Sequence, residues 1–143
     1  MNILRRLRGT TRILTLLTGL VSVISVLEPR FLSPSNLLNV LLQISIDGIL
    51  ACGLTLVILC GGLDLSVGAV MALSGVVFVI ALPYGIWLAG IIALLAGSAV
   101  GFTNGLLIGR LKLNSLIVTL GSMAVVQGIA LWLSRGYPIS GPG

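Results

Sequence analysis

The sequence predicts an all-α membrane protein, a polytopic bundle of about five transmembrane helices. Of its 143 residues, 57% are hydrophobic and only 8% are charged, whereas an average soluble domain carries about 25% charged residues. The mean hydropathy is +1.23. The few charges are also clustered, and the charge-free tracts between them approach the ~20 residues that a helix needs to cross the hydrocarbon. Lipid is therefore the predicted solvent.

Charges, prolines and glycines divide the chain into five apolar segments. The breaks are short and have turn chemistry, as in Pro83-Tyr84-Gly85, so they are not linkers between soluble domains. Ser35, followed by Asn36, is expected to cap the second segment, because a short side-chain oxygen accepts the free N–H groups at a helix start. In chain order, the expected transmembrane helices are residues 13–27, 37–59, 65–82, 86–108 and 113–133.

The distribution of basic residues predicts a cytoplasmic N-terminus. The net charge of +5 could suggest nucleic acid, but four of the eight basic residues precede the first segment, which is a topology signal under the positive-inside rule. No nucleic-acid partner is expected. With five spans, Arg110 and Lys112 also fall inside, and Arg30 and Arg135 fall outside. Four amphipathic aromatic residues then lie near the outer water–lipid boundary, namely Tyr84, Trp87, Trp132 and Tyr137.

The residues needed for most enzymatic chemistry are missing. There is no histidine, which excludes histidine-assisted nucleophilic catalysis and most histidine metal sites. Cys52 and Cys60 are about 12 Å apart along a helix, too far to bridge. The one lysine, Lys112, is not preceded by a phosphate-binding glycine loop. We expect no catalytic residues, metal or cofactor, so any ATP would be bound by another chain.

A strict spacing of four places small residues on one face of the fourth segment. In lipid, such a stripe lets neighbouring helix backbones approach closely. We predict helix packing here, with a direct role in a substrate path as the alternative. The stripe comprises Ala89, Ala93, Gly97, Gly101, Gly105 and Gly109.

Polar residues inside the apolar segments are candidate path residues. Asp47 lies midway along the second segment, where an ionised group costs about 2.5–3.5 kcal/mol. It should face protein or water, as either a packing acid or a polar wall of a path. Asn104 is expected to bridge helices through its amide, and Gln127 is comparable.

The most specific motif joins the second and third segments. Paired glycines free the backbone there, and Asp64 and Ser66 are predicted to cap the next helix. A plain turn would not need an eight-residue motif that contains several glycine and polar residues. The motif reads Gly61-Gly62-Leu63-Asp64-Leu65-Ser66-Val67-Gly68.

At this motif the chain resembles the permease subunits of the ribose, xylose and galactoside type of ABC sugar importers, which carry Gly-Gly-Ile-Asp-Leu-Ser-Val-Gly. Where many members have a neutral polar residue, this chain has Asp47. The resemblance also covers Phe31-Leu32-Ser33, Asn36-Leu37-Leu38-Asn39, Leu54-Thr55-Leu56-Val57-Ile58-Leu59, Met71-Ala72-Leu73-Ser74-Gly75, Asn104-Gly105 and Ile117-Val118-Thr119-Leu120-Gly121.

The resemblance implies that residues 1–143 are the N-terminal part of a permease in the bacterial inner membrane, without enzymatic activity of its own. Its expected partners are a second permease subunit, a cytoplasmic ATP-binding subunit, a periplasmic sugar-binding protein and membrane lipid. The cargo would be a monosaccharide such as ribose. Asp47, Asp64, Ser66 and Asn104 are the candidates for the substrate path or its gate. The alternative is a non-transporting fragment or a helix-pairing module.

Overall fold

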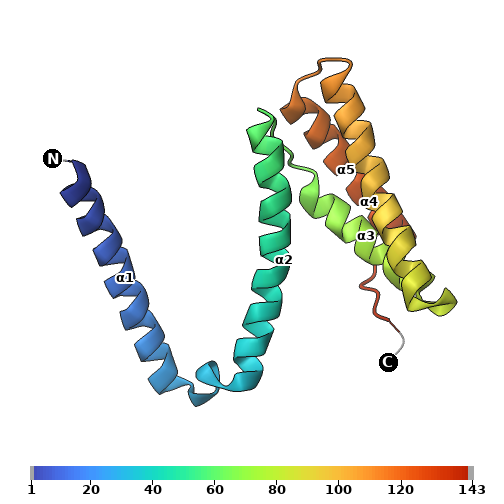
Figure 1. The fold of residues 1–143 in the computed structure, drawn as a ribbon. Coiled ribbons are helices and arrows are strands. Elements are labelled where there is room, and N and C mark those ends of the chain that lie inside the picture. Colours follow the sequence, from blue (N-terminus) through green and yellow to red (C-terminus); the bar gives the residue numbers. More distant parts are fainter. Residues whose placement is uncertain (1, 142–143) are drawn as a thin grey trace. The chain divides into compact units, whose positions relative to one another are not determined.

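The computed structural model describes residues 2–141, with side chains from Thr11 onward, and it is helical throughout (Figure 1). The described residues contain no strand, so the predicted all-α class is confirmed. The elements are α1 (Asn2–Leu27), η1 (Pro29–Leu32), α2 (Pro34–Leu59), α3 (Val67–Ala81), η2 (Leu82–Tyr84), α4 (Ile86–Gly109) and α5 (Ser115–Leu133).

Four of the described helices are long and apolar enough to cross a membrane. They are Pro34–Leu59, Val67–Tyr84, Ile86–Gly109 and Ser115–Leu133, and a shorter apolar stretch covers Thr11–Leu27. The protein is thus a multi-pass membrane protein. The helix α1 continues back through the basic residues to Asn2. The side chains of Arg5, Arg6 and Arg8, on which the predicted orientation rests, lie outside the described part.

The chain divides into two compact units, one ending at Ile49 and the other beginning at Leu50. In the first unit, the turn between α1 and α2 is held by local hydrogen bonds. Ser33 Oγ accepts from the backbone N–H of Asn36 over 3.3 Å, and the Asn36 side-chain amide donates to Phe31 O over 2.7 Å. The predicted cap at Ser35 is therefore wrong. Because α2 starts at Pro34, Ser33 stands at the capping position.

The second unit is built on α3, which packs against both α4 and α5. Its core contains small and branched residues from α3 and α5, with Val100 of α4 packed against them. Because the membrane is as apolar as leucine, few side chains need burial, and the outward faces stay covered with large apolar residues. The buried cluster is Ala69, Leu73, Val126 and Ala130.

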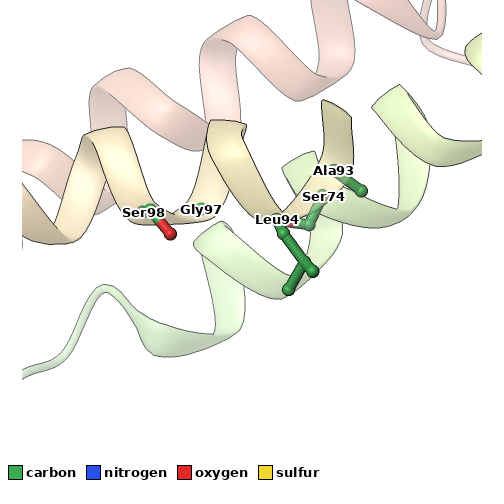
Figure 2. A pocket seen from close by; sticks show the side chains of 5 residues that line it. All are labelled: Ser74, Ala93, Leu94, Gly97 and Ser98. Carbon is green, nitrogen blue, oxygen red and sulfur yellow. The ribbon is translucent and has the colours of Figure 1, made fainter. Parts of the chain in front are cut away.

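The small-residue stripe of α4 packs on α3 along its first half. Ala89 is fully buried, and a Cβ added to Gly97 would stand 3.1 Å from Ser74 Oγ. Figure 2 shows this contact, with Ala93 and Gly97 of α4 beside Ser74 of α3. At the second half of the stripe, no atom lies within 4 Å of a Cβ added to Gly101, Gly105 or Gly109. A packing role for these three glycines stays a prediction.

The predicted boundary aromatics gather at one end of the second unit. They stand in η2, at the start of α4, at the end of α5 and just after it, where these elements come together in Figure 1. All four are exposed, as rings at a water–lipid boundary are. Which side of the membrane this end faces stays a prediction. The four residues are Tyr84, Trp87, Trp132 and Tyr137.

Candidate functional site

The break between α2 and α3 begins with a glycine-dependent helix stop. Gly61 has φ +77°, a left-handed conformation that side chains with a Cβ disfavour. Its N–H donates to Ile58 O over 2.9 Å, and the Gly62 N–H donates to Val57 O over 3.0 Å. This pair of bonds is a Schellman motif, which satisfies the last carbonyls of a helix. A Cβ on Gly62 would approach Val57 Cγ1 to 3.3 Å, which accounts for the second glycine.

Asp64 accepts hydrogen bonds from Ser66, the residue at which α3 starts. Its Oδ1 accepts both the backbone N–H of Ser66, over 2.8 Å, and the Ser66 hydroxyl, over 2.6 Å. Ser66 is the N-cap residue, but its side chain makes no capping bond. The prediction that the Ser66 side chain caps the next helix is therefore wrong, whereas Asp64 does accept the backbone N–H of Ser66 at the helix start. With φ −82° and ψ −11°, Ser66 is already helical, which differs from the extended backbone of a capping serine.

The side chain of Asn104 joins the start of α3 to both neighbouring helices. Its Nδ2 donates to Ser66 Oγ over 3.1 Å and to Ser122 Oγ on α5 over 3.0 Å. Ser66 is fully buried and Asn104 is 5% exposed. The amide of Asn104 thus bridges α3, α4 and α5. Gln127, which seemed comparable in sequence, is exposed and takes no part in this bridge.

A second group of bonds ties the preceding residues of the break to α5. The Leu63 N–H donates to Ser115 Oγ over 3.3 Å. Thr119, which is 1% exposed, lies with its hydroxyl 3.5 Å from Leu63 O and also donates to Ser115 O within α5 over 2.8 Å. Ser122 Oγ donates to Thr119 O over 3.1 Å. Sequence reasoning missed these residues. Their spacing of four and three, which places them on one helix face, was the available signal.

Asn114 supplies the N-cap of α5. Its Oδ1 accepts from the Leu116 N–H over 2.9 Å and from the Ile117 N–H over 3.4 Å. This cap fixes the start of the helix face that carries Ser115, Thr119 and Ser122. An asparagine directly before an apolar run was the sequence signal for it.

Asn104 and Ser122 lie inside the helical layer, away from the ends of α4 and α5. Asn104 is five residues before the end of α4, or about 7.5 Å at the usual rise. Ser122 is seven residues after the start of α5, or about 10 Å. The non-helical residues between α2 and α3 therefore run alongside α4 and α5. Irregular backbone at such a depth is tolerated where protein covers it or water reaches it, and the hydroxyls of α5 provide part of this cover.

A groove of about 420 Å³ opens beside the break. The end of α2 and the second half of the glycine stripe provide apolar walls, and the bonded residues provide a polar side. Asp64 is the only charged residue in the lining. The lining comprises Leu56, Val57, Cys60, Gly62, Leu63, Asp64, Gly101, Asn104, Gly105, Ile108, Gly109, Ser115 and Thr119.

Three of the four candidate path residues come together at this place, namely Asp64, Ser66 and Asn104. The fourth, Asp47, belongs to the first unit and is exposed on α2, so the bonded group is built without it. Cys52 and Cys60 are free thiols. Within the described residues, no three His, Cys, Asp or Glu side chains gather as metal ligands would.

Apolar helices of membrane-spanning length, a helix pair interrupted by glycines, and a polar-sided groove define a multi-pass protein of the transport type. Residues 36–140 match the family described as branched-chain amino acid transport system / permease component. The chain belongs to this permease family, and its resemblance to sugar-importer permeases is confirmed by its relatives.

Several curated relatives are named as sugar permeases. The ribose import permease protein RbsC of Bacillus subtilis is 44% identical over 131 residues, covering 87% of this chain and 39% of the relative. The L-arabinose ABC transporter permease protein AraH of Azospirillum brasilense is 41% identical, covering 82% of this chain and 35% of the relative. The D-allose transport system permease protein AlsC of Escherichia coli is 36% identical, covering 88% and 40%. No solved structure matches the chain.

The chain thus spans about two fifths of the length of these relatives. The family is one of transport permeases, which are not catalytic subunits.

Proposed function

We propose that this chain forms part of the translocation path of an ATP-driven importer for a monosaccharide such as ribose, in the inner membrane of a bacterium. The observation that carries the proposal is the 44% identity to a ribose import permease over 87% of the chain. The matched residues 36–140 include the whole bonded group at the break. Although the family description names branched-chain amino acids, the relatives named above carry sugars in their names.

The proposed partners follow from this role. A cytoplasmic subunit would hydrolyse ATP, a periplasmic protein would deliver the sugar, and a second permease subunit would complete the path. In support, this chain carries no histidine and has only three acidic residues. Hydrolysis by the chain itself would need a nucleotide site that its sequence does not contain.

The residues at the break have a mechanical role in this proposal. Alternating access requires some elements to move as a body while others bend. The hydrogen bonds that Ser66 accepts from Asn104 and that Leu63 donates to Ser115 bind the start of α3 to α4 and α5, so these three helices would move together. Gly61, which carries no Cβ, lies between this group and α2 and would absorb the change of angle. Asp47 is proposed to line the path on α2.

Uptake measurements test the proposal. The chain would be expressed with its genomic neighbours, with and without any downstream reading frame, in cells that lack their own importers for ribose, xylose and galactose. ATP-dependent accumulation of one labelled sugar, absent when this chain is omitted, is the expected result. No accumulation from any combination, despite confirmed membrane insertion, would contradict it.

A second candidate function is a helix-pairing module without transport activity. It is favoured by the open second half of the glycine stripe, where no atom lies within 4 Å of a Cβ added to Gly101, Gly105 or Gly109. Another helix could approach α4 closely there. The variant Gly105→Leu separates the two functions. A pairing module would lose its association with another helix even in the absence of sugar and ATP. Cross-linking in the membrane measures this association.

A further inference from the structure

Two acceptor oxygens remain unused after the hydrogen bonds at the break are assigned. Asn104 has two amide protons, and both are donated, to Ser66 and Ser122. Its carbonyl oxygen Oδ1 accepts no bond from the described residues. Asp64 receives both of its bonds on Oδ1, so Oδ2 likewise has no donor in the described part of the chain. A carboxylate oxygen and an amide oxygen each have capacity for further donors.

Both free oxygens belong to residues that line the groove. Asn104 is 5% exposed, and no buried side-chain oxygen or nitrogen of the described residues lacks a partner. The unpartnered Oδ1 of Asn104 must therefore reach open space, and the groove is the space that this residue lines. Asp64 is half-buried and lines the same groove.

The Asp64 carboxylate and the Asn104 amide are near each other because both are hydrogen-bonded to Ser66 Oγ. Asp64 Oδ1 lies 2.6 Å from Ser66 Oγ, and Asn104 Nδ2 lies 3.1 Å from the same atom. The fully buried serine hydroxyl thus holds both the carboxylate and the amide at the polar side of the groove. Their free oxygens can therefore accept from hydroxyl groups of one ligand in this groove.

The Ser115 hydroxyl adds a free hydrogen-bond donor to the two free acceptors of the groove. Ser115 Oγ accepts from the Leu63 N–H, but its own proton has no acceptor among the described residues, and Ser115 also lines the groove. A metal ion would use acceptors only. Hydroxyl groups both donate and accept, so they would use the free oxygens and the free proton together.

We propose that Asp64 Oδ2 and Asn104 Oδ1 accept the protons of two hydroxyls of a sugar of pentose size, with Ser115 donating to a sugar oxygen. The inference rests on the proposed function and gives it a binding station beside α3. The groove volume of about 420 Å³ admits a molecule of this size. Gly101 and Gly105 present a wall without side chains, against which the apolar face of a sugar ring can lie.

The test is binding of D-ribose to the full chain in lipid nanodiscs, measured by saturation transfer from the protein methyl protons to the sugar protons. The variant Asp64→Asn keeps an oxygen that can accept from Ser66, but it replaces the free acceptor with an amide donor. We expect its ribose affinity to fall about tenfold, the cost of losing one hydrogen bond to a charged group. Glu28→Gln, the same change of a carboxylate to an amide at an exposed residue that does not line the groove, is the matched control and should leave binding unchanged.

A second measurement keeps folding separate from binding. Circular dichroism and the thermal midpoint of Asp64→Asn should stay close to those of the unsubstituted chain, and Ser115→Ala should weaken ribose binding in the same direction. The inference is overturned if the unsubstituted chain gives no transfer to ribose, or if Asp64→Asn binds ribose as tightly as Glu28→Gln does. Sugar uptake without such binding would support the proposed permease function and contradict this binding site. Binding without uptake in any combination would support the binding site and contradict the permease function.

Discussion

The amide of Asn104 donates to the hydroxyl of Ser66 over 3.1 Å, although the two residues are 38 positions apart in the chain. This bond connects α4, five residues before its end, to the N-cap residue of α3. With the bond from Asn104 to Ser122 of α5, it places a buried polar contact among helices with largely apolar surfaces. The geometry of the break between α2 and α3 therefore depends on a residue far from it in sequence.

Replacing Asn104 with leucine should destabilise the chain by about 1–3 kcal/mol, because hydrogen bonds between membrane helices contribute about 0.6 kcal/mol each and up to about 1.7. Two such bonds are lost, and the Ser66 hydroxyl loses its donor. Reversible unfolding in mixed micelles would measure the change. Gln127→Leu, at an exposed amide, is the control and should cost little. Equal stabilities of the two variants would contradict the bridging role.

Leucine at Gly97 should disturb the packing of α3 on α4, since even its Cβ would stand 3.1 Å from Ser74 Oγ. The expected cost is about 1–3 kcal/mol, as for other overpacked sites. Gly101→Leu, on the same stripe but with open space at its Cβ, should be tolerated by the isolated chain. Unfolding of both variants in micelles checks this, and greater damage at Gly101 than at Gly97 would contradict the observed packing.

Alanine at Gly61 should destabilise the chain by about 1–2 kcal/mol, because its backbone must keep the left-handed conformation. Gly75→Ala is the matched control. Gly75 lies inside α3 with nothing near its Cβ, so alanine should be neutral or stabilising by about 0.5–1 kcal/mol. If both substitutions shift the unfolding midpoint in the same direction by similar amounts, the helix stop at Gly61 does not require a glycine.

Asp64→Ala should impair sugar uptake more than membrane insertion. The substitution leaves the backbone N–H and the hydroxyl of the fully buried Ser66 without their acceptor, which costs about 1–3 kcal/mol for a buried group. The start of α3 is then free to rotate away from α4 and α5. Uptake by the assembled importer, normalised to the amount of inserted permease, measures the effect. Transport at the level of the unsubstituted chain would reduce the motif to a dispensable turn.

Fold class and most helix boundaries could be predicted from the sequence. The expected segments 37–59, 65–82, 86–108 and 113–133 agree with α2 to α5 within three residues at each boundary. The expected segment 13–27 ends where α1 ends, but α1 begins at Asn2, because basic residues end an apolar stretch without ending a helix. The agreement has a physical cause. A bilayer demands about 20 apolar residues per span and requires that each segment satisfy its own backbone, so local composition alone decides where a helix begins and ends.

The composition of the polar site was decided by the tertiary structure. Asp47, midway along an apolar segment, and Asp64, between two segments, were both candidate path residues, yet only Asp64 accepts hydrogen bonds from the start of α3. Ser115 and Thr119 looked like ordinary polar residues of an apolar helix, yet both bind Leu63 in the break. Lipid supplies no hydrophobic force that drives helices together, so these contacts depend on how three helices pack.

The sequence by itself therefore determined that the chain spans a membrane several times and belongs with transport permeases. The tertiary structure decided which half of the glycine stripe is packed and which half lines a groove. It also decided which oxygens are used and which stay free. Hydropathy is a property of each segment in lipid, whereas a hydrogen bond between residues 38 positions apart exists only once the helices have met.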